Sequence, residues 1–214
     1  MDLPHFLRFH WNPTCCFKME TTRMADCIWS QVSCFALEES SSACSLHNNE
    51  RRKEVTEVMS IERVKNYFKQ FGMEERILEF DVSSATVELA AEALHCEPQR
   101  IAKTLSFMVE DHPVLIVAAG DAKIDNHKYK MQFAKKAKML AFDEVEALVG
   151  HAVGGVCPFG VNENVEVYLD ESLKRFESVF PACGSSNSAI EMTMEDLEKY
   201  SGYREWIDVC KGWA

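Results

Sequence analysis

The sequence predicts an α+β fold, and three patterns carry this prediction. Residues 60–72 have the apolar spacing of an amphipathic helix, and residues 105–119 have the pattern of a β-hairpin. From there to the C-terminus, short strand patterns alternate with short helix patterns. Apolar residues make up 47% of the 214 residues, which is enough to bury a core. We therefore expect one good-sized domain, preceded by a segment of different character.

Residues 1–58 differ from the rest of the chain, and we expect them to be an N-terminal extension without a packed fold. They show no sustained helical or strand period, and polar, linker-like stretches begin at Glu38 and Asn48. No pair of cysteines here has CxxC spacing, which argues against a zinc or redox site. These cysteines are Cys15, Cys16, Cys27, Cys34 and Cys44. The folded domain is expected to cover residues 59–211.

The first helix of the domain is predicted to begin at Ser60, a residue type that caps helix N-termini, and to end at Gly72. A short strand is expected over residues 77–80. A second helix is expected over residues 83–95, because capping candidates are followed there by strong helix formers.

A lysine lies at the start of the predicted hairpin. Residues 105–109 alternate in the period of a strand, a turn follows at residues 110–113, and residues 114–119 are a continuous apolar run. Lys103 lies where a helical turn that starts at Pro98 becomes the first strand. Its backbone is therefore anchored, and its ammonium group can reach into a cleft. The alternative is a solvated lysine at a strand end, which composition alone favours.

The most basic region follows the hairpin. Asp125 is expected to cap a helix over residues 126–136. The lysines of this region fit an RNA-backbone contact and a solvated helix face equally well. They are Lys128, Lys130, Lys135, Lys136 and Lys138. His127 starts the helix, and we expect it near the cleft as a substrate-binding residue. A strand over residues 139–142 and a short helix over residues 143–150 come next.

Paired glycines interrupt an apolar, strand-like segment over residues 151–160. Gly154 and Gly155 indicate a bulge, or a place where a ligand approaches the backbone. No His/Asp arrangement is readable around Cys157, which favours a small buried thiol over a nucleophile. Further elements are expected in the order strand, short helix, strand over residues 165–169, 171–176 and 179–182.

Residues 184–188 form a loop of small residues that is rich in backbone N–H groups and hydroxyls. Such a loop can cradle a carboxylate, a phosphate or a ribose, although an ordinary turn has the same composition. The candidate binding residues are Gly184, Ser185, Ser186 and Asn187. A strand over residues 189–192 and a helix that opens at Thr193 complete the pattern.

The overall charge narrows the function classes. A formal net charge of −11 argues against a broad basic surface for duplex nucleic acid, so no DNA partner is expected. No apolar run approaches the roughly 18–20 residues that a membrane span needs, and the N-terminus lacks the pattern of a secretory signal. We therefore expect a cytoplasmic protein with mostly free thiols. No residue spacing indicates a metal site, and no cofactor is expected.

Three stretches together resemble one known family. They are residues 100–107 (RIAKTLSF), residues 152–160 (AVGGVCPFG), and the loop at Gly184 with the Ala-Ile-Glu-Met-Thr that follows it. In this order and at this spacing they are similar to the YbaK/ProX family, also called the prolyl-tRNA synthetase-associated or INS-like editing domain. The resemblance covers residues 59–211. It implies a curved, mixed β-sheet or barrel surrounded by helices.

Members of this family hydrolyse the ester of a mischarged tRNA, most often a tRNA for proline that carries a wrong small amino acid. The resemblance implies that Lys103 is the key lysine, which holds the tRNA 3′ end or the acyl-ester region. It implies that the backbone of Gly154 and Gly155 binds the aminoacyl group and places the attacking water, and that the Gly184 loop closes the pocket. Because an aminoacyl ester is already activated, a held carbonyl, a placed water and backbone oxyanion stabilisation are the main requirements. The implied partners are the tRNA acceptor end and an aminoacyl-tRNA synthetase.

One position departs from the family pattern. Cysteinyl-tRNA deacylases of the family carry an acidic residue just before the Ile-Glu of the last strand, where this chain has Ala189. This argues against a strict cysteine specificity and leaves alanine, serine, threonine or another small acyl group open. The alternative function is a non-catalytic binding module of the same fold, which would take a small molecule, an RNA end or a protein partner.

Overall fold

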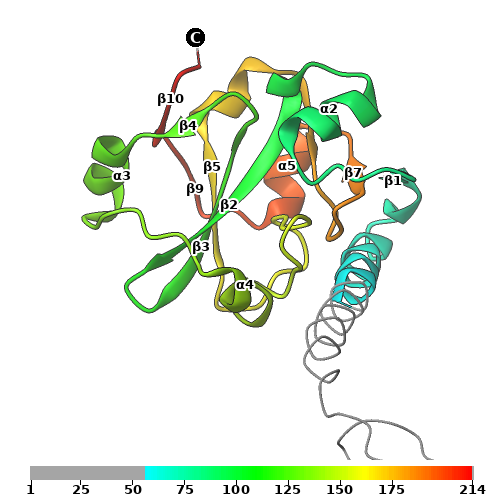
Figure 1. Ribbon diagram of the computed structural model, residues 1–214, viewed down its shortest axis with the longest axis horizontal. Coiled ribbons are helices and arrows are strands. Elements are labelled where there is room, and N and C mark those ends of the chain that lie inside the picture. The colour runs from blue at the N-terminus through cyan, green and yellow to red at the C-terminus, as the bar shows by residue number, and fades with distance from the viewer. Residues whose placement is uncertain (1–55, 214) are drawn as a thin grey trace, which may run out of the picture. The chain divides into compact units, whose positions relative to one another are not determined.

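The computed structural model describes residues 56–213 and has the expected α+β architecture (Figure 1). The predicted extension over residues 1–58 lies outside the described residues, except for its last few, which are helical. The helical segments are residues 56–69, η1 (Glu74–Arg76), α2 (Val87–Leu94), η2 (Pro98–Arg100), α3 (Asn126–Phe133), α4 (Phe142–Val149), η3 (Glu171–Arg175) and α5 (Met194–Ser201). The strands are β1 (Ile77–Glu79), β2 (Ile101–Val109), β3 (His112–Ala119), β4 (Lys123–Ile124), β5 (Glu166–Asp170), β6 (Ser178–Pro181), β7 (Ser188–Ile190), β8 (Met192–Thr193), β9 (Glu205–Ile207) and β10 (Cys210–Lys211).

Six strands form the main sheet, in the order β8-β6-β2-β3-β5-β9. The antiparallel pair β2 and β3 lies at its centre. Strand β6 runs parallel to β2, β5 runs parallel to β3, and β9 runs parallel to β5, so the sheet is mixed, as the family resemblance implied. Its strands twist and curve, as the ribbons of β2 and β3 show (Figure 1). Two further ladders, β1–β7 and β4–β10, are antiparallel.

The predicted hairpin is confirmed, and its first strand is longer than expected. β2 begins at Ile101, not at residue 105, because residues 102–104 also pair with β3 and the first two residues pair in parallel with β6. Val114–Ala119 of β3 are at most 1% exposed, as expected for a central strand that is covered on both faces. Lys103 is therefore the third residue of a strand, opposite Ala118, and is fixed by sheet pairing.

The first helix begins earlier than predicted. Residues 56–59 are already helical, so Ser60 is an interior helix residue that is only 3% exposed, and its assignment as the N-cap was wrong. Its hydroxyl lies 2.9 Å from Nδ1 of His151, so a tertiary partner satisfies the group that was expected to cap the helix. Phe68 of the same helix is fully buried, and its ring centroid lies 4.8 Å from that of Phe159.

Two segments predicted as strands are not strands. Residues 151–160 consist of turns and bends, so the predicted bulged strand was wrong. The apolar residues that suggested a strand, such as Cys157 and Phe159, are fully buried without sheet pairing. In the segment over residues 139–142, only Met139 makes an isolated bridge, to Phe107.

The helix caps follow elementary side-chain chemistry. Asp125 accepts hydrogen bonds from two backbone N–H groups at the start of α3, and Thr193 does the same for one N–H of α5, as predicted. Thr86 caps α2, which ends where His95 turns into the left-handed region at φ 51°. No helix in the described range 56–213 is both long enough and apolar enough to cross a membrane.

Candidate functional site

A cleft of about 350 Å³ opens where several segments meet beside β2. One wall is the loop before α2 together with that helix's first turn. The others are β2 over residues 101–106, the turn at Val153–Gly154, and the region where β6 passes into β7. Most of the lining is apolar, which favours binding of an uncharged group. Among the lining residues, Lys103 alone has a charged side chain, and none is a carboxylate or an imidazole.

Lys103 lies in the cleft wall with its ammonium group anchored. Its Nζ donates a hydrogen bond to the carbonyl oxygen of Gly120 at 2.9 Å. The side chain is half-buried, and the desolvation that burial causes lowers the pKa of its ammonium group. Lys103 is thus one of the residues that line the cleft, and its role in the site stays a prediction.

The two glycines of the 151–160 segment occupy different places. Gly154 lines the cleft in the left-handed region at φ 101°, and the nearest atoms that a Cβ there would meet belong to the side chains of Ser186 and Ala85. Gly155 does not line the cleft. A Cβ on it would lie 2.4 Å from backbone atoms of Gly184 and Ser185, so the two loops can approach only because this residue is glycine.

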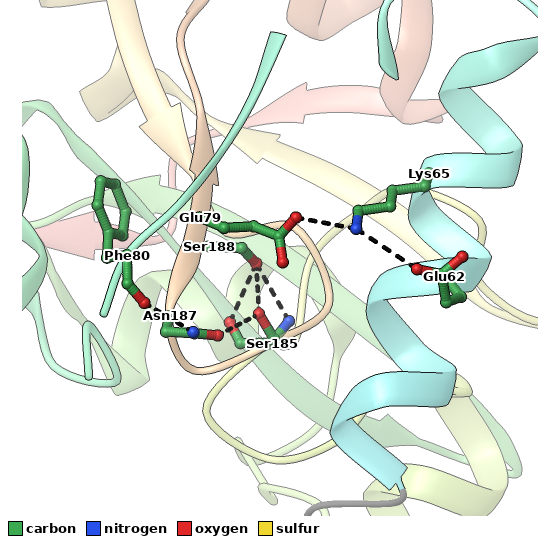
Figure 2. Close-up of polar contacts among 7 residues, drawn as sticks. All are labelled: Glu62, Lys65, Glu79, Phe80, Ser185, Asn187 and Ser188. Carbon is green, nitrogen blue, oxygen red and sulfur yellow. Dashed lines mark hydrogen bonds and ion pairs between the residues drawn. The ribbon is translucent and has the colours of Figure 1, made fainter. Parts of the chain in front are cut away.

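The loop over residues 184–188 is hydrogen-bonded both within itself and to neighbouring segments (Figure 2). Ser185 is 3% exposed, and its hydroxyl contacts Oδ1 of Asn187 at 2.8 Å and Oγ of Ser188 at 2.7 Å. The amide of Asn187 donates to the carbonyl oxygen of Phe80 at 2.8 Å. The carbonyl oxygen of Ser186 accepts a hydrogen bond from Ser84, which lines the cleft.

The predicted binding residues of this loop are thus not themselves cleft-lining. Neither Gly184 nor Ser185, Ser186 or Asn187 belongs to the lining, whereas the next two residues, Ser188 and Ala189, do. Figure 2 also shows ion pairs beside this loop, in which Lys65 contacts Glu79 at 2.8 Å and Glu62 at 3.4 Å. The Lys65–Glu79 pair joins the first helix to β1, and β1 pairs with β7 at the end of this loop.

His127 is not brought to the cleft. It lies in the first turn of α3, is exposed, and is absent from the cleft lining. In Figure 1, α3 is at the left of the sheet and α2, which borders the cleft, is at the upper right. The backbone N–H of His127 serves the helix cap by donating to Asp125.

Comparison with known proteins places this fold in a family. A family model described as an aminoacyl-tRNA editing domain matches residues 82–200. The chain belongs to this editing-domain family. The uncharacterized protein YwhH of Bacillus subtilis (strain 168) is 56% identical to it over 156 residues, which are 72% of this chain and 99% of that protein.

Other editing-domain relatives are more distant. A candidate Cys-tRNA(Pro)/Cys-tRNA(Cys) deacylase, EbsC of Enterococcus faecalis (strain ATCC 700802 / V583), is 31% identical over 114 residues, or 52% of this chain and 70% of that protein. The proline–tRNA ligase of Aquifex aeolicus (strain VF5) is 34% identical over 90 residues, which are 41% of this chain and only 16% of the ligase. A crystal structure of a candidate trans-editing enzyme for prolyl-tRNA synthetase has a TM-score of 0.65 and 28% identity, and covers 72% of this chain and 98% of that one.

Sequence reasoning missed several residues of this editing-domain cleft. Ser84–Val87 line it, although the sequence marked them only as the start of a helix. Thr104 and Ser106 also line it, although they looked like ordinary strand residues. The signal that was available is the N-cap pattern at Thr86, because the cleft lies at the start of the helix that Thr86 caps.

His151 is the centre of a buried polar cluster at the start of the 151–160 segment. His151 is fully buried, with Nδ1 at 2.9 Å from the Ser60 hydroxyl and Nε2 at 2.8 Å from the carbonyl oxygen of Phe159. Desolvation lowers the pKa of His151 to about 4 and raises that of Cys157 to about 12. Both groups are therefore neutral at pH 7, and the pKa of Cys157 favours the interpretation of a buried thiol over that of a nucleophile.

Proposed function

We propose that this editing-domain protein is an aminoacyl-tRNA deacylase that acts in trans. Its substrate would be the ester of a mischarged tRNA, namely a tRNA for proline that carries a small non-cognate amino acid. The observation that carries the proposal is the cleft, in which the anchored Lys103 and the Gly154 backbone line one small, mostly apolar space. The whole-length match to the structure of a candidate trans-editing enzyme supports action on a tRNA that another protein has charged.

Lys103 would hold the 3′ end of the tRNA or the acyl-ester region, because an ammonium group attracts phosphate and polarises oxygen atoms. The backbone at Gly154 would bind the aminoacyl group and place the attacking water, since a glycine lets a ligand approach the main chain closely. In hydrolysis the water oxygen adds to the ester carbonyl, the bond to the ribose oxygen breaks, and that oxygen leaves with a proton. The Gly155–Gly184 contact and the 184–188 loop would hold this wall in place.

The proposed partners are the acceptor end of the tRNA and an aminoacyl-tRNA synthetase, and the proposed location is the cytoplasm, where tRNA charging occurs. We keep the domain limits 59–211 as a proposal, with the addition that the first helix extends at least to Thr56. The acyl group would be small and uncharged, since Ala189 and its apolar neighbours line the cleft.

A deacylation assay tests this function. The full chain would be incubated with tRNAs for proline and alanine, each charged with alanine, cysteine, serine, threonine or proline. We expect release of one small non-cognate amino acid from the tRNA for proline, while the prolyl ester is spared. Equal release of all esters would contradict editing.

The alternative is a binding module that retains the fold without catalysis. The observation in its favour is that no carboxylate or imidazole lines the cleft, so none of the lining side chains is an ordinary general base. This function would be supported by saturable binding of the tRNA acceptor end without release of any amino acid in the same assay.

A further inference from the structure

Strand β2 has an open edge where it borders the cleft. On the side away from β3, the pairing of β2 with β6 ends at Ala102. Farther along the same edge, the carbonyl oxygen of Ser106 accepts from the N–H of Leu140 at 3.1 Å, and the N–H of Met108 donates to Lys138 at 2.8 Å. Thr104 lies between these two sets of bonds.

The backbone polar groups of Thr104 point to that open edge. Met108 is opposite Pro113 in the β2–β3 pair, and proline has no N–H, so this is a non-hydrogen-bonded pair. Because hydrogen-bonded and non-hydrogen-bonded pairs alternate, Thr104, which is four residues earlier, also belongs to a non-hydrogen-bonded pair. Its N–H and C=O therefore face away from β3, as those of Ser106 and Met108 do.

Within the described residues, the sheet supplies no partner for these two groups. β6 does not continue alongside Thr104, and the segment around Met139 joins β2 only farther along. The Thr104 hydroxyl oxygen is buried and also has no partner among the described residues. Residues 101–106 all line the cleft, so the unpaired stretch borders the space proposed for the substrate.

An aminoacyl ester carries two polar groups that match this edge. Its α-amine is a hydrogen-bond donor, and its ester carbonyl is an acceptor. The cleft lining offers no carboxylate to bind the amine, so a main-chain carbonyl is the acceptor that the strand can provide. In an antiparallel hydrogen-bonded pair, one residue exchanges both of its backbone bonds with the residue opposite.

We propose that the aminoacyl group adds to β2 as the antiparallel partner of Thr104. Its α-amine donates to the Thr104 carbonyl oxygen, and its ester carbonyl accepts from the Thr104 N–H. A single aminoacyl group thus pairs with the edge of β2 in the way that an extended peptide does in strand addition. It deepens the proposed function and rests on it, because it specifies an α-amino ester as the ligand class.

The bridge also has a catalytic consequence. When water adds to the ester carbonyl, negative charge develops on the oxygen that the Thr104 N–H already binds. A hydrogen bond to an anionic oxygen is stronger than one to a neutral carbonyl, so this N–H stabilises the transition state more than the ground state. The bond to the ribose oxygen then breaks, and the products are the free amino acid and the ribose hydroxyl.

A pair of substrates tests the amine contact. Alanyl and propionyl esters of the same tRNA for proline differ only in the α-amine. We expect the full chain to hydrolyse the propionyl ester about 50-fold or more slowly in kcat/KM, after correction for the uncatalysed rates of the two esters. Equal corrected rates would overturn the bridge and leave the deacylase function standing. If neither ester is hydrolysed, the proposed function fails, and the following measurement still decides the bridge.

The N–H contact can be observed directly by NMR. The protein would be labelled with ¹⁵N-threonine and titrated with adenosine that carries alanine through a 3′ amide in place of the ester. Thr104→Val identifies the resonance, because its signal is absent from the labelled variant. The Thr104 amide should shift more than that of Thr86, which also lines the cleft. A shift at Thr86 alone, or no shift at millimolar ligand, would contradict the bridge.

Thr104→Val also distinguishes amine recognition by the main chain from amine recognition by the side chain. Valine keeps both backbone groups and the shape of the side chain and removes only the hydroxyl. The preference for alanyl over propionyl ester should therefore persist in this variant, whatever its absolute rate. Loss of the preference would assign amine recognition to the hydroxyl and overturn the backbone bridge.

Discussion

The loop over residues 184–188 reaches the cleft only at Ser188, whereas the edge of β2 borders it at Thr104, and the two regions differ in how their polar groups are used. In the loop, the buried hydroxyl of Ser185 and the amide of Asn187 are bonded within the chain. At the strand edge, the N–H, C=O and hydroxyl of Thr104 have no partner among the described residues. The loop looked like the binding element in the sequence because it is rich in hydroxyls, whereas the strand looked ordinary.

This difference shows that polar composition alone does not identify a binding surface. A buried polar group that the fold already satisfies stabilises the scaffold, and binding a ligand there would require breaking its bonds. A polar group left without a partner beside a cleft gains a hydrogen bond when a ligand arrives. Substitutions in the two regions should therefore affect stability and activity differently.

The largest effect is expected from Gly155→Ala on the scaffold side. Its Cβ would lie 2.4 Å from the backbone of Gly184 and Ser185, and neither backbone can move without displacing its loop. We expect a loss of about 3 kcal/mol or more in the free energy of unfolding, measured by urea denaturation.

Gly154→Ala is the matched control on the cleft side. Its Cβ would meet no atom closer than 3.3 Å, but the residue has φ 101°, so strain of about 1–2 kcal/mol is expected and the variant should fold. Its deacylation rate should fall, whereas its free energy of unfolding should drop by no more than this strain. Equal stability losses in both variants would contradict the division into scaffold and cleft.

His151 is expected to make the scaffold sensitive to acid. Desolvation lowers the pKa of His151 in the folded chain to about 4, from the 6.5 of a solvated histidine. As the pH falls below about 6.5, the unfolded chain takes up a proton first, so stability is lost between about pH 6.5 and pH 4. The full loss amounts to about 3 kcal/mol. Denaturation curves at pH 7 and pH 4 measure it.

His151→Gln is the control for this acid sensitivity. Glutamine has both a donor and an acceptor for the groups at Ser60 and Phe159, but it does not titrate. The variant should be less stable than the native chain at pH 7 and should lose less stability between pH 7 and pH 4. An unchanged pH dependence would show that other groups cause the acid sensitivity.

Lys103→Ala is expected to have a large effect on activity and a small one on stability. The substitution removes the charged side chain of the cleft lining, so kcat/KM for deacylation should fall about 100-fold or more. The lost side-chain contact is one hydrogen bond to Gly120, and the melting temperature should change by only a few degrees. Lys69→Ala, at an exposed lysine outside the cleft lining, should leave kcat/KM unchanged.

Ser185→Ala should show the reverse pattern. It removes a buried hydroxyl from the bonded loop and leaves Oδ1 of Asn187 without this donor, which costs about 1–2 kcal/mol of stability. The folded variant should deacylate nearly as fast as the native chain. A large fall in kcat at unchanged stability would assign the loop hydroxyls to substrate binding.

The sequence predicted the elements of this fold better than it predicted the site. Period-2 and helical spacing, with caps such as Asp125 and Thr193, are local signals, and the structure confirms them. The role of Ser60 depends on His151, which is 91 residues away, and no local pattern contains that contact. The open edge at Thr104 depends on where β6 stops pairing, which is likewise a property of the tertiary structure.

The smallest effect is expected from the lysines beside the cleft. Lys136 and Lys138 are exposed, have no ion pair within residues 56–213, and precede Met139, which lines the cleft. By contrast, Lys128 contacts Asp208 at 2.7 Å and Lys135 contacts Glu110 at 3.6 Å. If the tRNA leaves the cleft on this side, its phosphates meet the two uncompensated lysines.

Replacing both Lys136 and Lys138 with alanine should then raise KM for charged tRNA about two- to fivefold and leave kcat unchanged, since exposed charges act weakly through solvent. The difference from the native chain should shrink as salt is added, because each lost phosphate contact lowers the salt dependence of binding. Lys128→Ala is the control, because Asp208 already neutralises that ammonium group, and its KM should not change. An effect of the double substitution that is independent of salt would mean that these lysines act through packing and that the acceptor stem lies elsewhere.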